Sequence, residues 1–239
     1  MGALSLLKLV ALGAAVAGGL PAGTLTISPV SVVLARGQTS AMVKVANSRS
    51  NPIVMQAQIF RWTQDGDKDA LTATSDVILS PPMATIPGGA EQVLRLLMRP
   101  GKPADAAIER HYRMLLGEIP AAGASPGDLS FAMRVSIPVF VTPDQPIVPA
   151  LEWRAVRGQG DQIVLTVVNT GSAYDRIIAL SVAMPGGAAV AAVPLGTNTY
   201  ILPGARRRWT VDGKITNATV NLTVVVRAGR STMSLPIES

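Results

Sequence analysis

Few side chains in this sequence could carry out catalysis. His111 is the only histidine and cysteine is absent, so the sequence supports neither a histidine-rich metal site nor a Ser-His-Asp triad, and it excludes a thiol nucleophile. No GxSxG or P-loop motif occurs, and the two glycines of GQG (158–160) are too weak a signal for a dinucleotide site. We therefore expect no catalytic residue, no cofactor and no metal.

The acidic segment DGDKDA, which begins at Asp65, is the best candidate for a cation site. Asp65, Asp67 and Asp69 have the early spacing of a calcium loop, and Asp76 stands at its twelfth position. However, Ala70 occupies the sixth position, where the loop needs glycine, and an aspartate replaces the bidentate glutamate. The spacing favours a solvated acidic hairpin tip.

Positive charge exceeds negative charge, with a formal net charge of +6 and a pI near 10.2. Such a balance suggests an anionic partner or surface, yet charged residues make up only 15% of the chain and aromatic residues 4%. That is poor material for binding nucleic acid. The cluster ARRRW (205–209) is expected to be a solvated strand start, with an anionic-surface contact as the alternative. No feature selects the two carboxylates of a glycosidase.

The segment GDLSFAMRVSIPVFV (127–141) shows the strongest pattern that could position a binding surface. Apolar side chains occupy its odd positions from Leu129 onward, which is typical of a β-strand with one apolar face. The alternation lasts about twice as long as an average strand of about five or six residues. Pro138 favours a sheet edge or a bulge. Periodicity alone favours an ordinary core strand.

The rest of the chain consists of short β-like runs separated by turn signals, with at most a short helix at PADAAIER (103–110). This pattern predicts an all-β sandwich fold. The proline-rich segment TPDQPIVP (142–149) reads as a stiff connector, after which the pattern restarts. We expect one domain over 23–143, a hinge over 144–149 and a second domain over 150–239.

The first 22 residues have the features of a secretory signal peptide. Lys8 precedes an apolar stretch of about the usual length, and cleavage could follow Ala17 or Ala22. The stretch is shorter than the about 18–20 apolar residues that a membrane span needs. An exported chain without cysteine must have cores large enough to do without disulfides.

Several segments together resemble the periplasmic chaperones of the chaperone–usher pathway. LTISPVSVVLARGQ resembles the first strand of that family, VKVANSRSNPIVMQAQIFRW the next two, and SPPMATIPGGAEQVLRL and HYRMLLGEIP two later motifs. The segments IFRWTQ and IPVFV resemble the archaic branch of this family more than its P and type 1 systems. The resemblance implies two immunoglobulin-like sandwiches in a boomerang arrangement. It also implies that the strand around 129–141, called the G-strand in this family, inserts into the groove of an incomplete subunit. This mode of binding is donor-strand complementation.

This resemblance also implies which residues bind. The donor side chains would be those on the odd positions of the strand: Leu129, Phe131, Met133, Val135 and Ile137. Family members of the P and type 1 systems hold the subunit carboxylate with an arginine and a lysine, but Ser31 and Pro138 stand at those positions here.

Arg95 and Arg113 are the replacement candidates for that anchor, and salt-bridged or solvated strand arginines are the alternative. Glu118 matches the interdomain glutamate of the family, although its usual arginine partner is replaced by Thr142.

The function predicted from these features is that of a non-enzymatic periplasmic chaperone. It would bind pilin-like subunits and deliver them to an outer-membrane usher, without nucleic acid and without stable membrane insertion. The alternative is an exported two-domain adhesin or carbohydrate-binding module, against which the low content of three Trp, three Tyr and three Phe argues. A glycosidase-like enzyme ranks third.

Overall fold

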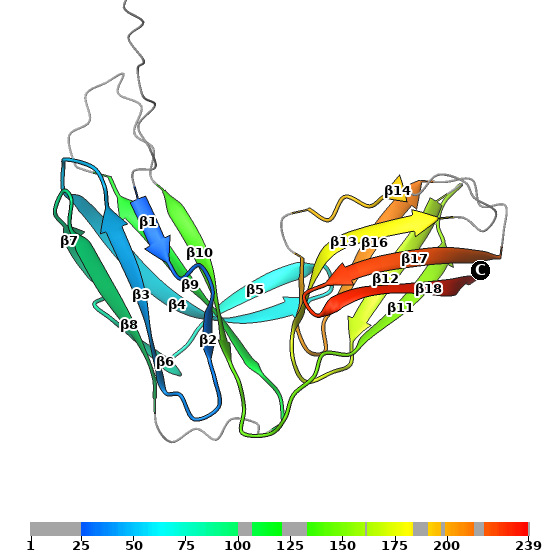
Figure 1. Ribbon diagram of the computed structural model, residues 1–239, viewed down its shortest axis with the longest axis horizontal. Helices are drawn as coiled ribbons and strands as arrows, with labels where there is room; N and C mark the ends of the chain where they lie inside the picture. The colour runs from blue at the N-terminus through cyan, green and yellow to red at the C-terminus, as the bar shows by residue number, and fades with distance from the viewer. Residues whose placement is uncertain are drawn as a thin grey trace, which may run out of the picture.

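A computed structural model of the chain describes residues 25–99, 107–120, 133–160, 162–183, 191–196, 199–212 and 218–238. All regular structure in these ranges is β-strand, and two sandwiches meet at an open angle (Figure 1). The described residues contain no helix long and apolar enough to cross a membrane. The predicted signal peptide, residues 1–22, lies outside the described ranges.

In the described part of the chain, ten strands form the first sandwich. They are β1 (Leu25–Ser28), β2 (Val32–Leu34), β3 (Ser40–Asn47), β4 (Ile53–Asp65), β5 (Lys68–Ala73), β6 (Val77–Ser80), β7 (Met83–Ile86), β8 (Glu91–Met98), β9 (Arg110–Ile119) and β10 (Arg134–Val141). One sheet has the order β1-β3-β8-β6, and the other has the order β2-β10-β9-β4-β5 with β7 beside β4. Alternate apolar residues of both sheets, such as Val43, Leu96 and Met114, are fully buried between them. This arrangement is the expected result of period-two alternation on two facing sheets.

Eight strands of the described residues form the second sandwich. They are β11 (Leu151–Arg157), β12 (Gln162–Asn169), β13 (Asp175–Ala183), β14 (Ala191–Ala192), β15 (Tyr200–Ile201), β16 (Arg206–Asp212), β17 (Thr219–Val226) and β18 (Gly229–Glu238). They pair in the order β14-β13-β17-β18-β11-β12-β16, with β15 beside β13. The last strand joins the layers, because β18 pairs with β17 along its length and in parallel with β11 at Ala155 and Val156.

A buried asparagine closes a turn in each sandwich. The Nδ2 group of Asn47 donates to the carbonyl oxygens of Asn51, Ile86 and Pro87, and the Nδ2 group of Asn169 donates to those of Ala173 and Ile201. Both asparagines are almost completely buried. Because unpaired buried polar groups are costly, these bonds fix the loops that follow β3 and β12.

The connection between the sandwiches runs from Thr142 to Ala150, after β10 and before β11. It includes the segment 144–149 that the sequence predicts as a hinge. Its Val148 carbonyl accepts hydrogen bonds from the N–H groups of Ser172 and Ala173, so this end of the connection is bound to the second domain. The hinge itself stays a prediction.

Candidate functional site

The first half of β10 is an open sheet edge. Residues Arg134 to Val141 pair with β9 on one side, but on the other side β2 covers only Val139 to Val141. Among the described residues, no strand pairs with the outer side of 134–138. Backbone N–H and C=O groups along such an edge form a template for a strand from another chain.

Side chains along this edge change from half-buried to fully buried. Met133 and Val135 are half-buried, and Val135 packs against the core of the first domain. Leu129 and Phe131 lie outside the described residues. Ile137 is completely buried in the core of its own domain, together with Val139 and Val141.

This burial corrects one residue of the predicted donor set. Ile137 lies where the two sheets of the first domain already enclose the strand, so its side chain is not free to enter a partner's groove. The apolar face that could reach outward is therefore the part that begins at Val135 and runs toward the amino end of the strand.

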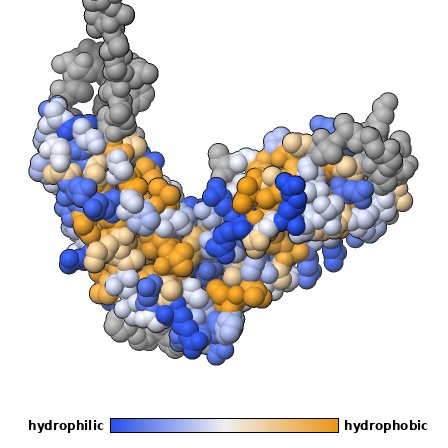
Figure 2. All heavy atoms as spheres, viewed as in Figure 1, coloured by the Kyte–Doolittle hydropathy of each residue, from blue (hydrophilic) through white to orange (hydrophobic). Residues whose placement is uncertain are grey.

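Figure 2 shows apolar residues gathered on the arm formed by the first domain. On the face in view they cover the region in which Figure 1 places β1 and β10. Hydrophilic residues are prominent where the two arms meet. The open strand edge thus adjoins apolar surface, which in a stable protein often marks an interaction site.

Arg113 lies on β9 directly opposite Pro138 of β10. Directly opposite residues of an antiparallel pair share one face, with their Cβ atoms about 5 Å apart. Arg113 therefore stands beside the position at which the family resemblance implies a lysine. Val32, the residue after Ser31, pairs with Val139, so the other family position is also nearby.

The guanidinium of Arg113 is held in the seam between the domains. It lies 3.7 Å above the Trp62 ring and 5.3 Å from the Tyr200 ring, and its side chain is only 13% exposed. Burial lowers the pKa of Arg113 below its usual value, and the Asp69 carboxylate acts in the opposite direction. Arginine still remains charged at neutral pH. Asp69 lies 3.9 Å away, beyond hydrogen-bond distance, so this ion pair does not occupy the guanidinium donors.

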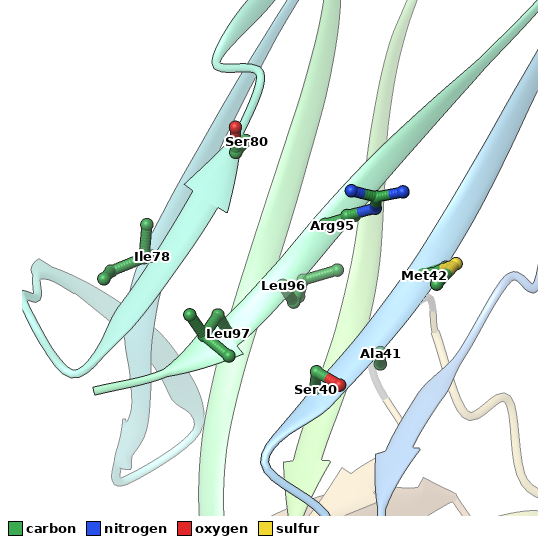
Figure 3. A pocket seen from close by; sticks show the side chains of 8 residues that line it. All are labelled: Ser40, Ala41, Met42, Ile78, Ser80, Arg95, Leu96 and Leu97. Carbon is green, nitrogen blue, oxygen red and sulfur yellow. The ribbon is translucent and has the colours of Figure 1, made fainter. Parts of the chain in front are cut away.

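Arg95, the other predicted anchor, lies on a different surface. It belongs to β8 in the sheet that does not contain β10, where it pairs across the strands with Met42 and Ser80. Figure 3 shows it at the side of a shallow hollow with the side chains of Met42, Ile78 and Leu97. The structure therefore does not bring Arg95 and Arg113 together.

Glu118 is not an interdomain residue in this structure. Its carboxylate pairs with Arg49 at 2.6 Å, and its neighbour across β4 is Met55, so these partners lie in the first domain. The prediction placed it at the wrong end of β9. Glu118 lies near the Ile119 end of β9, whereas the Arg110 end lies near the second domain. Most of the strand therefore separates Glu118 from that domain.

Glu109, just before β9, is a carboxylate that joins the two domains. Its backbone N–H donates to the Ser172 carbonyl at 3.0 Å, and its Oε2 accepts a 3.0 Å hydrogen bond from the Tyr174 N–H. The Nε2 atom of His111 lies 3.1 Å from the same oxygen. Sequence reasoning missed Glu109, because a single acidic residue before a strand carries no sign of a partner 65 residues away.

Aromatic side chains fill the seam beside Glu109. Trp62 and Phe140 come from the first domain but belong to the buried cluster of the second. The rings of Phe140 and Tyr174 are stacked with centroids 3.7 Å apart. The two sandwiches thus share an apolar contact that continues their separate cores.

The acidic segment and the arginine cluster, both expected to be solvated, bind each other. Asp67 accepts hydrogen bonds from the Arg208 guanidinium at 3.0 and 3.1 Å, and Asp69 accepts one from Arg207 at 2.7 Å. The aspartates lie at an exposed hairpin tip, as expected, but Asp67 and Asp69 are paired because the strands β4 and β5 reach the second domain (Figure 1). Within the described residues no group of His, Asp and Glu could hold a metal ion.

These features define a two-domain immunoglobulin-like protein with an open strand edge beside an interdomain seam. Residues 24–146 match the family described as pili and flagellar-assembly chaperone, PapD N-terminal domain. The chain therefore belongs to this family of pilus-assembly chaperones, whose members are not enzymes. No curated protein sequence matches the chain.

Solved structures of pilus chaperones have the same fold. The chaperone–tip subunit complex CsuC–CsuE of the archaic Csu pili of Acinetobacter baumannii matches with a TM-score of 0.66 and 24% identity, covering 91% of this chain and 100% of that chain. The Salmonella enterica SafB chaperone complex with the SafA pilin matches with a TM-score of 0.60 and 18% identity, covering 89% and 96%. The E. coli chaperone DraB matches with a TM-score of 0.59 and 19% identity, covering 90% and 95%.

Proposed function

We propose that this protein is a periplasmic chaperone that binds pilin-like subunits by donor-strand complementation and delivers them to an outer-membrane usher. The observation that carries this proposal is the open edge of β10 at 134–138. Backbone groups on such an edge can extend a partner's sheet, and alternate apolar side chains can fill its pockets. Leu129, Phe131, Met133 and Val135 are the proposed donor side chains.

Family membership supports the choice of partner. Two of the similar structures are described as a chaperone with a tip subunit and a chaperone with a pilin. One of them belongs to an archaic system, in agreement with the resemblance of IFRWTQ and IPVFV in this chain to the archaic branch. The periplasmic location rests on the family and on the predicted signal peptide over 1–22.

Arg113 is the proposed anchor for the subunit's terminal carboxylate. Its place opposite Pro138 and its partly dry surroundings beside Trp62 favour it over Arg95, which stands on the other sheet. A charge-assisted hydrogen bond in such surroundings is shorter and stronger than one between neutral groups. Arg113 would thereby fix the register in which the subunit lies along β10.

The direct test is co-expression with the subunit encoded beside the chaperone gene. The double variant Phe131→Ala with Met133→Ala should lose at least about thirty-fold in subunit binding, because burying such side chains contributes about 2–5 kcal/mol. Arg134→Ala is the matched control, since Arg134 is exposed and points to the opposite face of the same strand. It should capture the subunit almost as well as the unchanged chaperone.

Melting temperatures of the free variants separate binding from folding. We expect the double variant to melt close to the unchanged protein. Normal capture by a folded double variant would contradict the donor-strand proposal. Unfolding of the double variant would show that Phe131 and Met133 belong to the core of the first domain, which would contradict it equally.

A further inference from the structure

The hairpin formed by β4 and β5 connects the two domains at its far end. Gln64, near the end of β4, donates through Nε2 to the Tyr200 carbonyl at 3.0 Å and accepts through Oε1 from the Leu202 N–H at 3.0 Å. One side chain thus pairs with two backbone groups of the second domain, on either side of Ile201. Such a double contact fixes both the position and the orientation of the hairpin against β15.

Charged groups strengthen this contact. The two Asp67 carboxylate oxygens accept from the backbone N–H of Arg208 at 2.9 Å and from its guanidinium at 3.0 and 3.1 Å. Arg207 donates to the Asp67 carbonyl and to the Asp69 carboxylate. Bidentate pairs of this kind define geometry more strictly than a single exposed ion pair does.

Burial distinguishes one arginine of this cluster from its neighbours. The side chain of Arg207 is 6% exposed, whereas that of Arg208 is 55% exposed. A buried arginine that loses its partner is left as an uncompensated charge. The domains therefore cannot separate at this point without exposing Arg207 or leaving it unpaired.

The same hairpin surrounds Arg113, the proposed carboxylate anchor. Asp69 lies between Arg207 at 2.7 Å and Arg113 at 3.9 Å, and Trp62 lies under the Arg113 guanidinium. Trp62 is cross-strand neighbour to Leu71, so it belongs to the same hairpin. A shift of the hairpin would therefore move the groups that hold Arg113.

We propose that the β4–β5 hairpin is an interdomain clamp, in which Asp67, Asp69, Arg207 and Arg208 set the angle between the two domains and position Arg113. The first part, the fixed angle, concerns the free protein. The second part, the effect on subunit binding, rests on the proposed function. Asp67, Asp69 and Arg207 act through Arg113 and are positioning residues.

The clamp can be tested by measuring the distance between the domains. Because the chain has no cysteine, two introduced cysteines can carry spin labels at unique positions. Ser48→Cys, just after β3, and Arg157→Cys, at the end of β11, are both at exposed residues of different domains. The unchanged protein should give one narrow distance distribution, and Asp67→Lys should broaden or shift it.

Two further variants make the result specific. Exchanging the charges with Asp67→Lys and Arg208→Asp re-forms the ion pair but not the hydrogen bond from the residue 208 N–H, so it should narrow the distribution relative to Asp67→Lys alone. Arg206→Ala, an exposed arginine two positions along the same strand for which the described residues show no partner, should leave it unchanged. If Asp67→Lys is not folded, Arg208→Ala replaces it, because Arg208 is largely exposed. A narrow, unshifted distribution in the folded clamp variant would overturn the proposal.

Subunit capture by the same variants tests the positioning role. We expect at least a threefold weaker capture by Asp67→Lys and recovery in the charge-exchanged variant. A broadened distance with normal capture would overturn the positioning role and leave the clamp. If the unchanged chaperone captures no subunit, the proposed function fails, while the distance measurement still decides whether the clamp exists.

Discussion

Two parts of the first domain extend beyond its own core, and they differ in their contact partners. The hairpin of β4 and β5 carries charged and polar groups that find partners in the second domain, including Asp67 on Arg208 and Gln64 on Leu202. The amino-terminal half of β10 carries apolar side chains and an edge for which the described residues offer no strand partner. The hairpin makes contacts within the molecule, and in the proposed function the strand edge makes a contact with another molecule.

The difference between the two follows from their chemistry. Salt bridges and bidentate hydrogen bonds need fixed geometry, which a partner in the same chain provides at all times. A backbone edge with apolar side chains can pair with many sequences, because ladder bonds do not depend on side-chain identity. An exposed edge of this kind promotes aggregation unless it is covered or paired.

Trp62 provides the largest expected effect on the hairpin side of this comparison. It is 1% exposed and lies in the buried cluster of the second domain. Replacing a buried tryptophan with alanine typically costs about 3–5 kcal/mol, so Trp62→Ala should clearly lower the free energy of unfolding in urea. Leu71→Ala is the control on the neighbouring strand, since Leu71 is 41% exposed and its loss should change stability by less than about 1 kcal/mol. Equal losses in both variants would contradict the burial of Trp62 in the seam between the domains.

Arg113 lies where the two regions come together, and its expected effect is smaller. Arg113→Met keeps a long apolar stem on Trp62 but removes the charge. Losing a hydrogen bond to a charged group costs about 1.5–3 kcal/mol, which corresponds to roughly a ten- to hundred-fold weaker capture of the subunit. Arg95→Met, on the opposite sheet, should capture normally. Normal capture by Arg113→Met in a titration of purified subunit would exclude Arg113 as the anchor.

Much of the fold could be predicted from the sequence because its signals are local. Alternation from Leu129 to Val141 predicts a strand, and its described part from Arg134 to Val141 is the strand β10. The proline-rich segment 142–149 marks the connection between two groups of strands. The two-sandwich arrangement is inferred from the resemblance of several segments to the family, and several of these motifs lie inside 24–146. Neither inference requires knowledge of which distant residues meet.

The errors concern contacts between distant residues. Ile137 and Val135 have the same parity and similar chemistry, and only the position of the facing sheet shows that Ile137 is enclosed by its own domain. Glu109 and Glu118 both lie at an end of β9, and the Tyr174 N–H selects Glu109. Asp67 and Arg208 are exposed, as expected, but they are 141 residues apart, so nothing in the sequence indicated that they pair.

Hydrogen exchange at the open edge tests the central claim most directly. Amide protection reports the pairing of backbone groups segment by segment. When the chaperone binds its subunit, the amides of 133–138 that face the open side (Pro138 has none) should exchange at least about ten times more slowly, because the partner strand pairs with the free edge. Amides in 64–69 of the hairpin, already bonded within the molecule, should change little. Unchanged exchange in 133–138 with new protection elsewhere on a fully formed complex would contradict donor-strand pairing at β10.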